Sequence, residues 1–271
     1  MAINDVTLAG GMRNNLVSLQ NVTMLQARTT ERLSTGKRVN SAVDDPSAFF
    51  AAQNHRNKAN DLGAKKDSMG EAIQTVKAAL QGIDGITKLI EQAKGLAASA
   101  RSASTTDRAS LATQYDSLRT QITQLASDAG YKGTNFLASG SSLTVEFNAD
   151  ASSTLTVSGF DASASGLSLT AAASSWASDA NINTDVTKLD AALTTLRANA
   201  KTLESNNGVI TTRQEFTSSM INTLTSGADA LTAADSNEEG ANMLALQTRQ
   251  QLGIVALQLS SQAQQSVMRL F

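Results

Sequence analysis

The stretch from Ile182 to Leu231 carries a nearly unbroken heptad pattern, and it constrains the fold more than any other part of the chain. Apolar residues recur there at alternating steps of four and three positions, which places them on one stripe of an α-helix. Sustained over about seven heptads, the spacing predicts one helix roughly 75 Å long that packs in a coiled-coil manner. The stripe consists of Ile182, Val186, Leu189, Leu193, Leu196, Ala200, Leu203, Asn207, Ile210, Gln214, Thr217, Ile221, Leu224, Ala228 and Leu231.

Three closely spaced positions of this stripe, Asn207, Gln214 and Thr217, are polar. Two interpretations stay open for them. The facing helix could end or shift at this point, so that the polar side chains meet water. Alternatively, the polar side chains fix the register of the pairing, as single buried polar residues do in coiled coils.

The composition argues against catalytic and metal-binding functions. The chain of 271 residues has no cysteine and one histidine, so it has neither thiolate ligands nor a cysteine nucleophile. His55 has no accompanying metal-binding motif, and we interpret it as a surface or interface histidine. The net charge of −2 favours neither nucleic acid nor an anionic membrane as a partner. We therefore expect no enzyme, no cofactor, no metal site, and no nucleic-acid or membrane partner.

The rest of the chain is also predicted to be mainly helical. An amphipathic pattern over residues 5–33 is followed by the polar segment 34–45. Asp45 before Pro46, the only proline, predicts a capped start for a second, long helix. A cation site at Asp44 and Asp45 is the less favoured interpretation. Residues 235–239, DSNEE, predict the start of the last helix.

Residues 134–178 differ from the rest, because Ser, Thr and Gly dominate there. Apolar and polar residues alternate with a period of two, which predicts a β-hairpin around the turn-like sequence NADASS. The apolar residues of this alternation are Leu143, Val145, Phe147, Leu155 and Val157. The single tryptophan, Trp176, is expected to pack against this region.

Two segments at opposite ends of the chain resemble bacterial flagellins. Residues 32–45, RLSTGKRVNSAVDD, resemble the N-terminal signature of that family. The QQLGI run at 250–254, followed by AQQSV at 263–267, resembles its closing helix. The resemblance is sharpest over residues 1–60 and 240–271, and the middle of the chain matches no particular member.

The resemblance implies a specific architecture. The terminal helices would pair as an inner coiled-coil layer formed by residues 1–40 and 236–271. Residues 41–235 would form a long antiparallel helical bundle, with the β-hairpin region at about 134–178. The expected fold class is thus mainly α, with only the two inner layers that flagellins share.

The resemblance also implies a function, namely a structural subunit that polymerises into the flagellar filament and drives swimming motility. It implies an extracellular location reached without a cleaved signal peptide. The implied partners are other copies of the chain, the flagellar export apparatus, a flagellin export chaperone, and the hook-associated and cap proteins. The alternatives are a hook–filament junction protein of the same superfamily and a cytoplasmic coiled-coil adaptor.

The residues expected at the assembly interface lie in the two terminal regions. Most are apolar residues of the end helices, and two are polar residues of the N-terminal signature. They are Leu16, Leu19, Val22, Arg32, Asn40, Leu252, Val255, Leu259, Val267 and Leu270.

Overall fold

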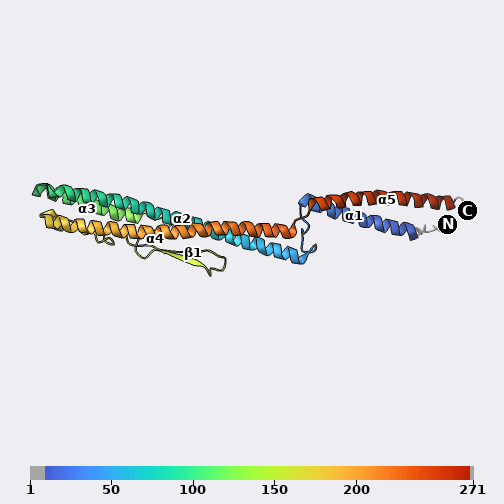
Figure 1. Ribbon diagram of the computed structural model, residues 1–271, viewed down its shortest axis with the longest axis horizontal. Helices are drawn as coiled ribbons and strands as arrows, with labels where there is room; N and C mark the ends of the chain where they lie inside the picture. The colour runs from blue at the N-terminus through green and yellow to red at the C-terminus, as the bar shows by residue number, and fades with distance from the viewer. Residues whose placement is uncertain (1–9, 269–271) are drawn as a thin grey trace, which may run out of the picture. The chain divides into compact units, whose positions relative to one another are not determined.

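The computed structural model describes residues 10–268, most of which are helical (Figure 1). In chain order the elements are α1 (Gly10–Thr35), α2 (Pro46–Arg101), α3 (Thr105–Asp128), β1 (Ser142–Glu146), β2 (Thr154–Ser158), the short 3-10 helix η1 (Ala173–Trp176), α4 (Asp179–Thr232) and α5 (Ser236–Met268). The mainly α fold with one small hairpin is therefore confirmed.

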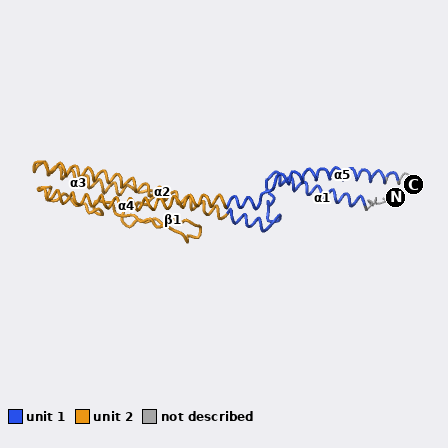
Figure 2. The backbone as a smooth tube through the Cα atoms, viewed as in Figure 1, with its two compact units in different colours: residues 1–56, 224–271 blue, residues 57–223 orange. Residues whose placement is uncertain are grey.

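The chain divides into two compact units (Figure 2). One comprises residues 1–56 and 224–271, and the other residues 57–223. Both borders fall inside the long helices α2 and α4, so the first unit contains the terminal helices, the segments that connect them to the bundle, and the adjoining ends of α2 and α4. The domain limits expected near residues 40 and 235 remain a prediction.

Helix α4 confirms the heptad pattern. Its 54 residues span the whole predicted stretch, and every stripe position is buried or half-buried. Gln214 bears on the open question of the polar positions, because its Nε2 donates to the main-chain oxygen of Lys66 at 3.2 Å. Helix α2 thus continues alongside α4 at this level, which favours the register-setting interpretation. Asn207 makes no corresponding contact, since its buried Oδ1 has no hydrogen-bond partner among the described residues.

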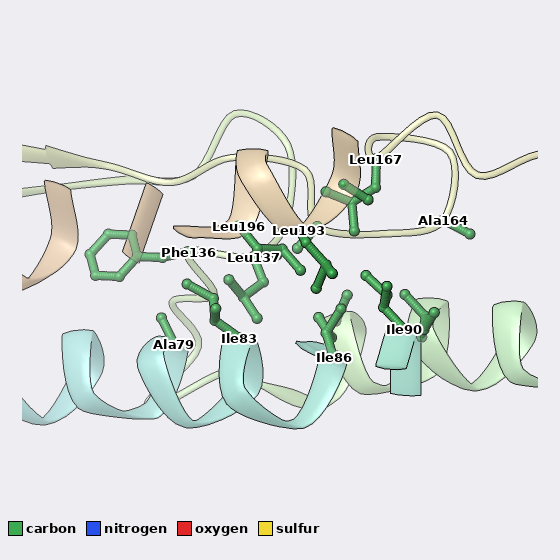
Figure 3. Close-up of a cluster of buried hydrophobic side chains, with 14 of the residues drawn as sticks. Ala79, Ile83, Ile86, Ile90, Phe136, Leu137, Ala164, Leu167, Leu193 and Leu196 are labelled. Carbon is green, nitrogen blue, oxygen red and sulfur yellow. The ribbon is translucent and has the colours of Figure 1, made fainter. Parts of the chain in front are cut away.

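The core of the second unit lies between α2 and α4, and the segment after α3 closes it. In Figure 3, Ile83 and Ile86 of α2 point toward Leu193 and Leu196 of α4. Leu137 packs close to α2 because the helix has a glycine there. A Cβ atom on Gly82 would lie 2.6 Å from Leu137 Cδ1, so no larger residue fits without a shift of the chain.

Strands β1 and β2 form the predicted hairpin. They pair antiparallel, with Leu143 opposite Val157 and Val145 opposite Leu155. These four side chains face the core, with Val145 and Val157 buried. Thr144 and Thr156 lie opposite each other on the exposed face, with their hydroxyl oxygens 3.3 Å apart. The alternation read in the sequence is therefore the inward and outward alternation of a two-stranded sheet.

The environment of Trp176 differs from the expectation, because its ring contacts a helix. It packs on Tyr115 of α3, with ring centroids 5.2 Å apart. Its Nε1 donates to Asp185 Oδ2 of α4 at 2.9 Å, and the same oxygen accepts from the main-chain N–H of Ala173 at 2.9 Å. Burial and the nearby Asp185 charge raise the pKa of the Tyr115 phenol.

Candidate functional site

Helices α1 and α5 pack against each other in the first unit, as the expected pairing of the terminal helices requires. Each contributes one stripe at heptad spacing, and we call the two stripes together the seam. All seam residues are buried or half-buried. On α1 they are Met12, Asn15, Leu19, Val22, Gln26, Thr29 and Arg32, and on α5 they are Glu239, Met243, Leu246, Gln250, Gly253, Leu257 and Ser260.

Two contacts fix the alignment of the seam. Leu19 packs over Gly253, where an added Cβ would lie 2.7 Å from Leu19 Cδ1. Near the C-terminal end of α1, Arg32 Nη1 forms an ion pair with Glu239 Oε1 at 2.7 Å, and the Glu239 side chain is only 7% exposed. These two levels show that α1 and α5 run antiparallel.

The segments that link the terminal helices to the bundle also pair with each other. The main-chain N–H of Arg38 donates to Thr232 O at 2.7 Å, and that of Ala234 donates to Gly36 O at 3.0 Å. Gly36 has a φ of 66°, a left-handed conformation that glycine adopts without strain. The predicted break after α1 is therefore a short segment that pairs antiparallel, through main-chain hydrogen bonds, with the segment before α5.

Asp45 acts as a helix cap, as the favoured interpretation required, whereas Asp44 stabilises the turn that precedes the helix. Asp45 Oδ1 accepts from Ala48 N at 3.0 Å and caps α2. Asp44 Oδ2 accepts from the main-chain N–H groups of Ser41, at 3.0 Å, and Asn40, at 3.2 Å. These bonds, the one from the Ser41 main chain above all, hold the pKa of Asp44 below its usual value. In the segment between α4 and α5, Asp235 Oδ1 accepts a hydrogen bond from Asn237 N, over 2.8 Å, where α5 begins.

Helix α5 carries a second stripe, which lies on the side opposite the seam. We call it the outer stripe of α5. Its large apolar residues are among the most exposed of the described chain, with Leu252 at 64%, Val255 at 59% and Leu259 at 68%. The outer stripe consists of Leu244, Thr248, Leu252, Val255, Leu259 and Ala263.

The structure separates the expected interface residues into groups. Leu19, Val22 and Arg32 lie together in the seam. Asn40 uses its side-chain amide inside its own chain, where Nδ2 donates to Thr35 Oγ1 at 3.3 Å. Leu16 is exposed beside the seam.

The remaining expected residues belong to α5. Leu252, Val255 and Leu259 are on the outer stripe, away from α1. The side chain of Val267 and the whole of Leu270 lie outside the described residues. The role of all ten residues in assembly remains a prediction.

The sequence did not reveal the α5 half of the seam. Its apolar periodicity is weak because it is interrupted by Gln250, Gly253 and Ser260. The only signal in the sequence is the four-and-three spacing of the positions from Glu239 to Ser260.

Within residues 10–268 there is no cluster of three or more acidic, cysteine or histidine residues that could hold a metal ion. In the same range, no helix is long and apolar enough to cross a bilayer.

Comparison with known proteins gives matches over the whole length of the chain. Residues 3–142 match the model of the bacterial flagellin N-terminal helical region. Flagellin FljM of Caulobacter vibrioides is 34% identical, and the alignment covers 100% of both chains. Flagellin FljK of the same organism is 33% identical, again over 100% of both chains. A flagellin of Brucella melitensis is 31% identical over 90% of each chain.

Among solved structures, the crystal structure of Bacillus cereus flagellin aligns with a TM-score of 0.49 at 19% identity, covering 55% of this chain and 88% of that chain. The match to the family model and the relatives aligned over their full length are sufficient to identify the family without this crystal structure. They show that the chain belongs to the bacterial flagellins, the family of structural proteins that build the flagellar filament.

Proposed function

We propose that this flagellin polymerises through its terminal helices, and that the outer stripe of α5 is buried against other copies in the filament. One observation carries the proposal. Helix α5 pairs with α1 along a seam in which three of the α5 positions are Gln250, Gly253 and Ser260, while its more apolar stripe stays exposed. The more apolar side of an amphipathic helix is normally the side that is buried.

The energetics support the same conclusion. Burial of a Leu or Val side chain stabilises an interface by about 1.5–3 kcal/mol relative to full exposure. Four large apolar residues of the outer stripe, Leu244, Leu252, Val255 and Leu259, are exposed by more than half, so most of this stabilisation is still available to a partner. A contact of this kind recurs in every subunit of a helical polymer, and small contributions accumulate along it.

Family membership over the full length supports the finer features of the proposed function. We propose that the polymer is the extracellular filament, that the export apparatus delivers the chain with the help of an export chaperone, and that cap and hook-associated proteins contact its ends. The role is structural and not catalytic. In support, each chemical feature of the terminal helices described above serves packing, capping or pairing.

Electron microscopy of the purified full-length chain tests the proposal and separates it from a hook–filament junction role. After addition of ammonium sulfate, we expect filaments many subunits long, whose length grows with the protein concentration. A junction protein would give single subunits or short closed assemblies under the same conditions. Absence of filaments at every concentration, from a chain whose circular dichroism shows folded helices, would contradict the proposed function.

A further inference from the structure

Helix α1 also carries a stripe on the side opposite the seam, which we call the outer stripe of α1. Its positions follow the heptad steps of four and three, and all of them are exposed. Val17 is 54% exposed and Met24 is 63% exposed. The outer stripe of α1 consists of Arg13, Val17, Gln20, Met24, Ala27 and Glu31.

The two outer stripes point in opposite directions. In each helix the outer stripe lies opposite the seam, and the two helices face each other across the seam. The helix pair therefore presents a mostly apolar stripe on the α5 side and, on the α1 side, a mixed stripe whose apolar residues are Val17, Met24 and Ala27. A second copy in the same orientation would meet the α1 side of the first with its own α5 side.

The two stripes also match in length and in charge. At 1.5 Å per residue, the outer stripe of α5 from Leu244 to Ala263 is about 28 Å long, and that of α1 from Arg13 to Glu31 is about 27 Å long. The α5 stripe has no charged residue, and the α1 stripe has charges only at its ends. The long side chains of Arg13 and Glu31 can reach water at the margins of a contact while the uncharged centre is covered.

We propose that the outer stripe of α1 is the docking surface for the outer stripe of α5 from a second copy of this chain. The inference rests on the proposed function and adds the partner surface and its order. Because the two surfaces differ, each copy uses one to bind a neighbour and leaves the other free. Such a heterologous contact continues from copy to copy without closing on a dimer.

The absence of cysteine makes disulfide cross-linking a direct test. Val255→Cys is combined in turn with Val17→Cys, Gln20→Cys, Met24→Cys or Ala27→Cys, and assembled filaments are oxidised and run on denaturing gels. Successive α1 positions are about 5 Å apart along the helix, so the series samples the axial offset between copies. A disulfide forms only where the Cα atoms approach within about 7 Å.

Links within one copy are excluded by geometry. Val17 and Val255 lie at the same level of the pair, two residues from the Leu19–Gly253 contact, but on its opposite outer sides. The helix axes of such a pair are about 8–10 Å apart, so the two Cα atoms lie beyond the reach of a disulfide. Oxidised monomers of the double variants serve as the control and should show no internal link.

We expect at least one double variant to give a ladder of covalent trimers and higher multimers, and every single variant to stay monomeric. Covalent dimers from Val255→Cys alone would overturn the inference, because they place two outer stripes of α5 against each other. Filaments in which no double variant forms multimers would also overturn it and leave the proposed function standing. Failure of the unsubstituted chain to form filaments would instead refute the proposed function, and this inference with it.

Discussion

Leu259→Asp is expected to give a folded chain that forms no filaments. Leu259 lies on the outer stripe of α5 and is 68% exposed in the single chain, so the substitution should leave the fold intact. In the filament an aspartate at this position would be buried without a partner, which costs several kcal/mol. A loss of about 3 kcal/mol per contact raises the concentration needed for polymerisation by more than about 100-fold. Sedimentation of polymer across a concentration series measures this directly.

Two control variants distinguish the effect of a charge on the outer stripe from the effect of an added charge elsewhere on α5. Leu259→Met keeps an apolar side chain on the outer stripe and should polymerise nearly as the unsubstituted chain does. Gln258→Asp adds the same charge one residue earlier, at an exposed position off the stripe. It should polymerise at a concentration within about tenfold of the unsubstituted chain, which corresponds to about 1.4 kcal/mol. Normal filaments from Leu259→Asp would remove the outer stripe of α5 from the interface.

Asp185→Ala is expected to lower the free energy of unfolding by about 3–5 kcal/mol, as the loss of one partner from a buried charged network does. Asp185 is fully buried and accepts hydrogen bonds from Trp176 Nε1 and Ala173 N, and its Oδ1 lies 3.2 Å from Lys188 Nζ. Without the carboxylate, the buried Trp176 Nε1 and the half-buried N–H of Ala173 lose their acceptor, and an unsatisfied buried donor costs about 1–3 kcal/mol. Urea denaturation followed by circular dichroism gives the stability of the helices.

The fluorescence of Trp176, the only tryptophan, reports on the turn itself. The turn should loosen, because Ser174, Ser175 and Trp176 all have left-handed φ angles of 45–60°, which are unfavourable for residues other than glycine. We expect red-shifted emission from Asp185→Ala. Asp185→Asn retains a carbonyl oxygen as acceptor and should lose less stability. Unchanged stability and emission in Asp185→Ala would show that the carboxylate does not hold the turn.

The parts of the fold that follow from local periodicity could be predicted from the sequence. The stripe of α4 is apolar at nearly every position, so its spacing alone defines the helix and its buried side. The hairpin follows from the alternation at Leu143, Val145 and Val157, and the starts of α2 and α5 follow from Asp45 and Asp235. In each case the residues that carry the pattern are close in the sequence.

The features that depend on distant residues could not be predicted. Gly253 belongs to the seam because Leu19 needs the space above it, and nothing near Gly253 in the sequence shows this. The η1 turn adopts backbone angles that its serines do not favour, and a carboxylate from α4 stabilises it. The partners of Trp176, namely Tyr115 and Asp185, come from two helices, so its position in the sequence does not show what it packs against.

The candidate site was predictable in composition but not in arrangement. The sequence identified the most apolar stripe of α5, which is the one that stays exposed in the single chain. It did not identify the more polar stripe with which α5 binds α1. Hydrophobic periodicity shows which side of a helix is expected to be buried. It does not show whether the segment that buries this side belongs to the same chain or to another copy.

The accessibility of position 255 before and after polymerisation shows directly whether the outer stripe of α5 is buried between copies. In a Val255→Cys variant the single thiol lies at a site that is 59% exposed, and it should react rapidly with a maleimide reagent in the monomer. In filaments we expect its labelling to slow by at least about tenfold, while a control thiol in the exposed hairpin turn, introduced as Asp150→Cys, reacts at a nearly unchanged rate. Equal labelling of position 255 in monomers and filaments would contradict the claim that the outer stripe of α5 is buried between copies.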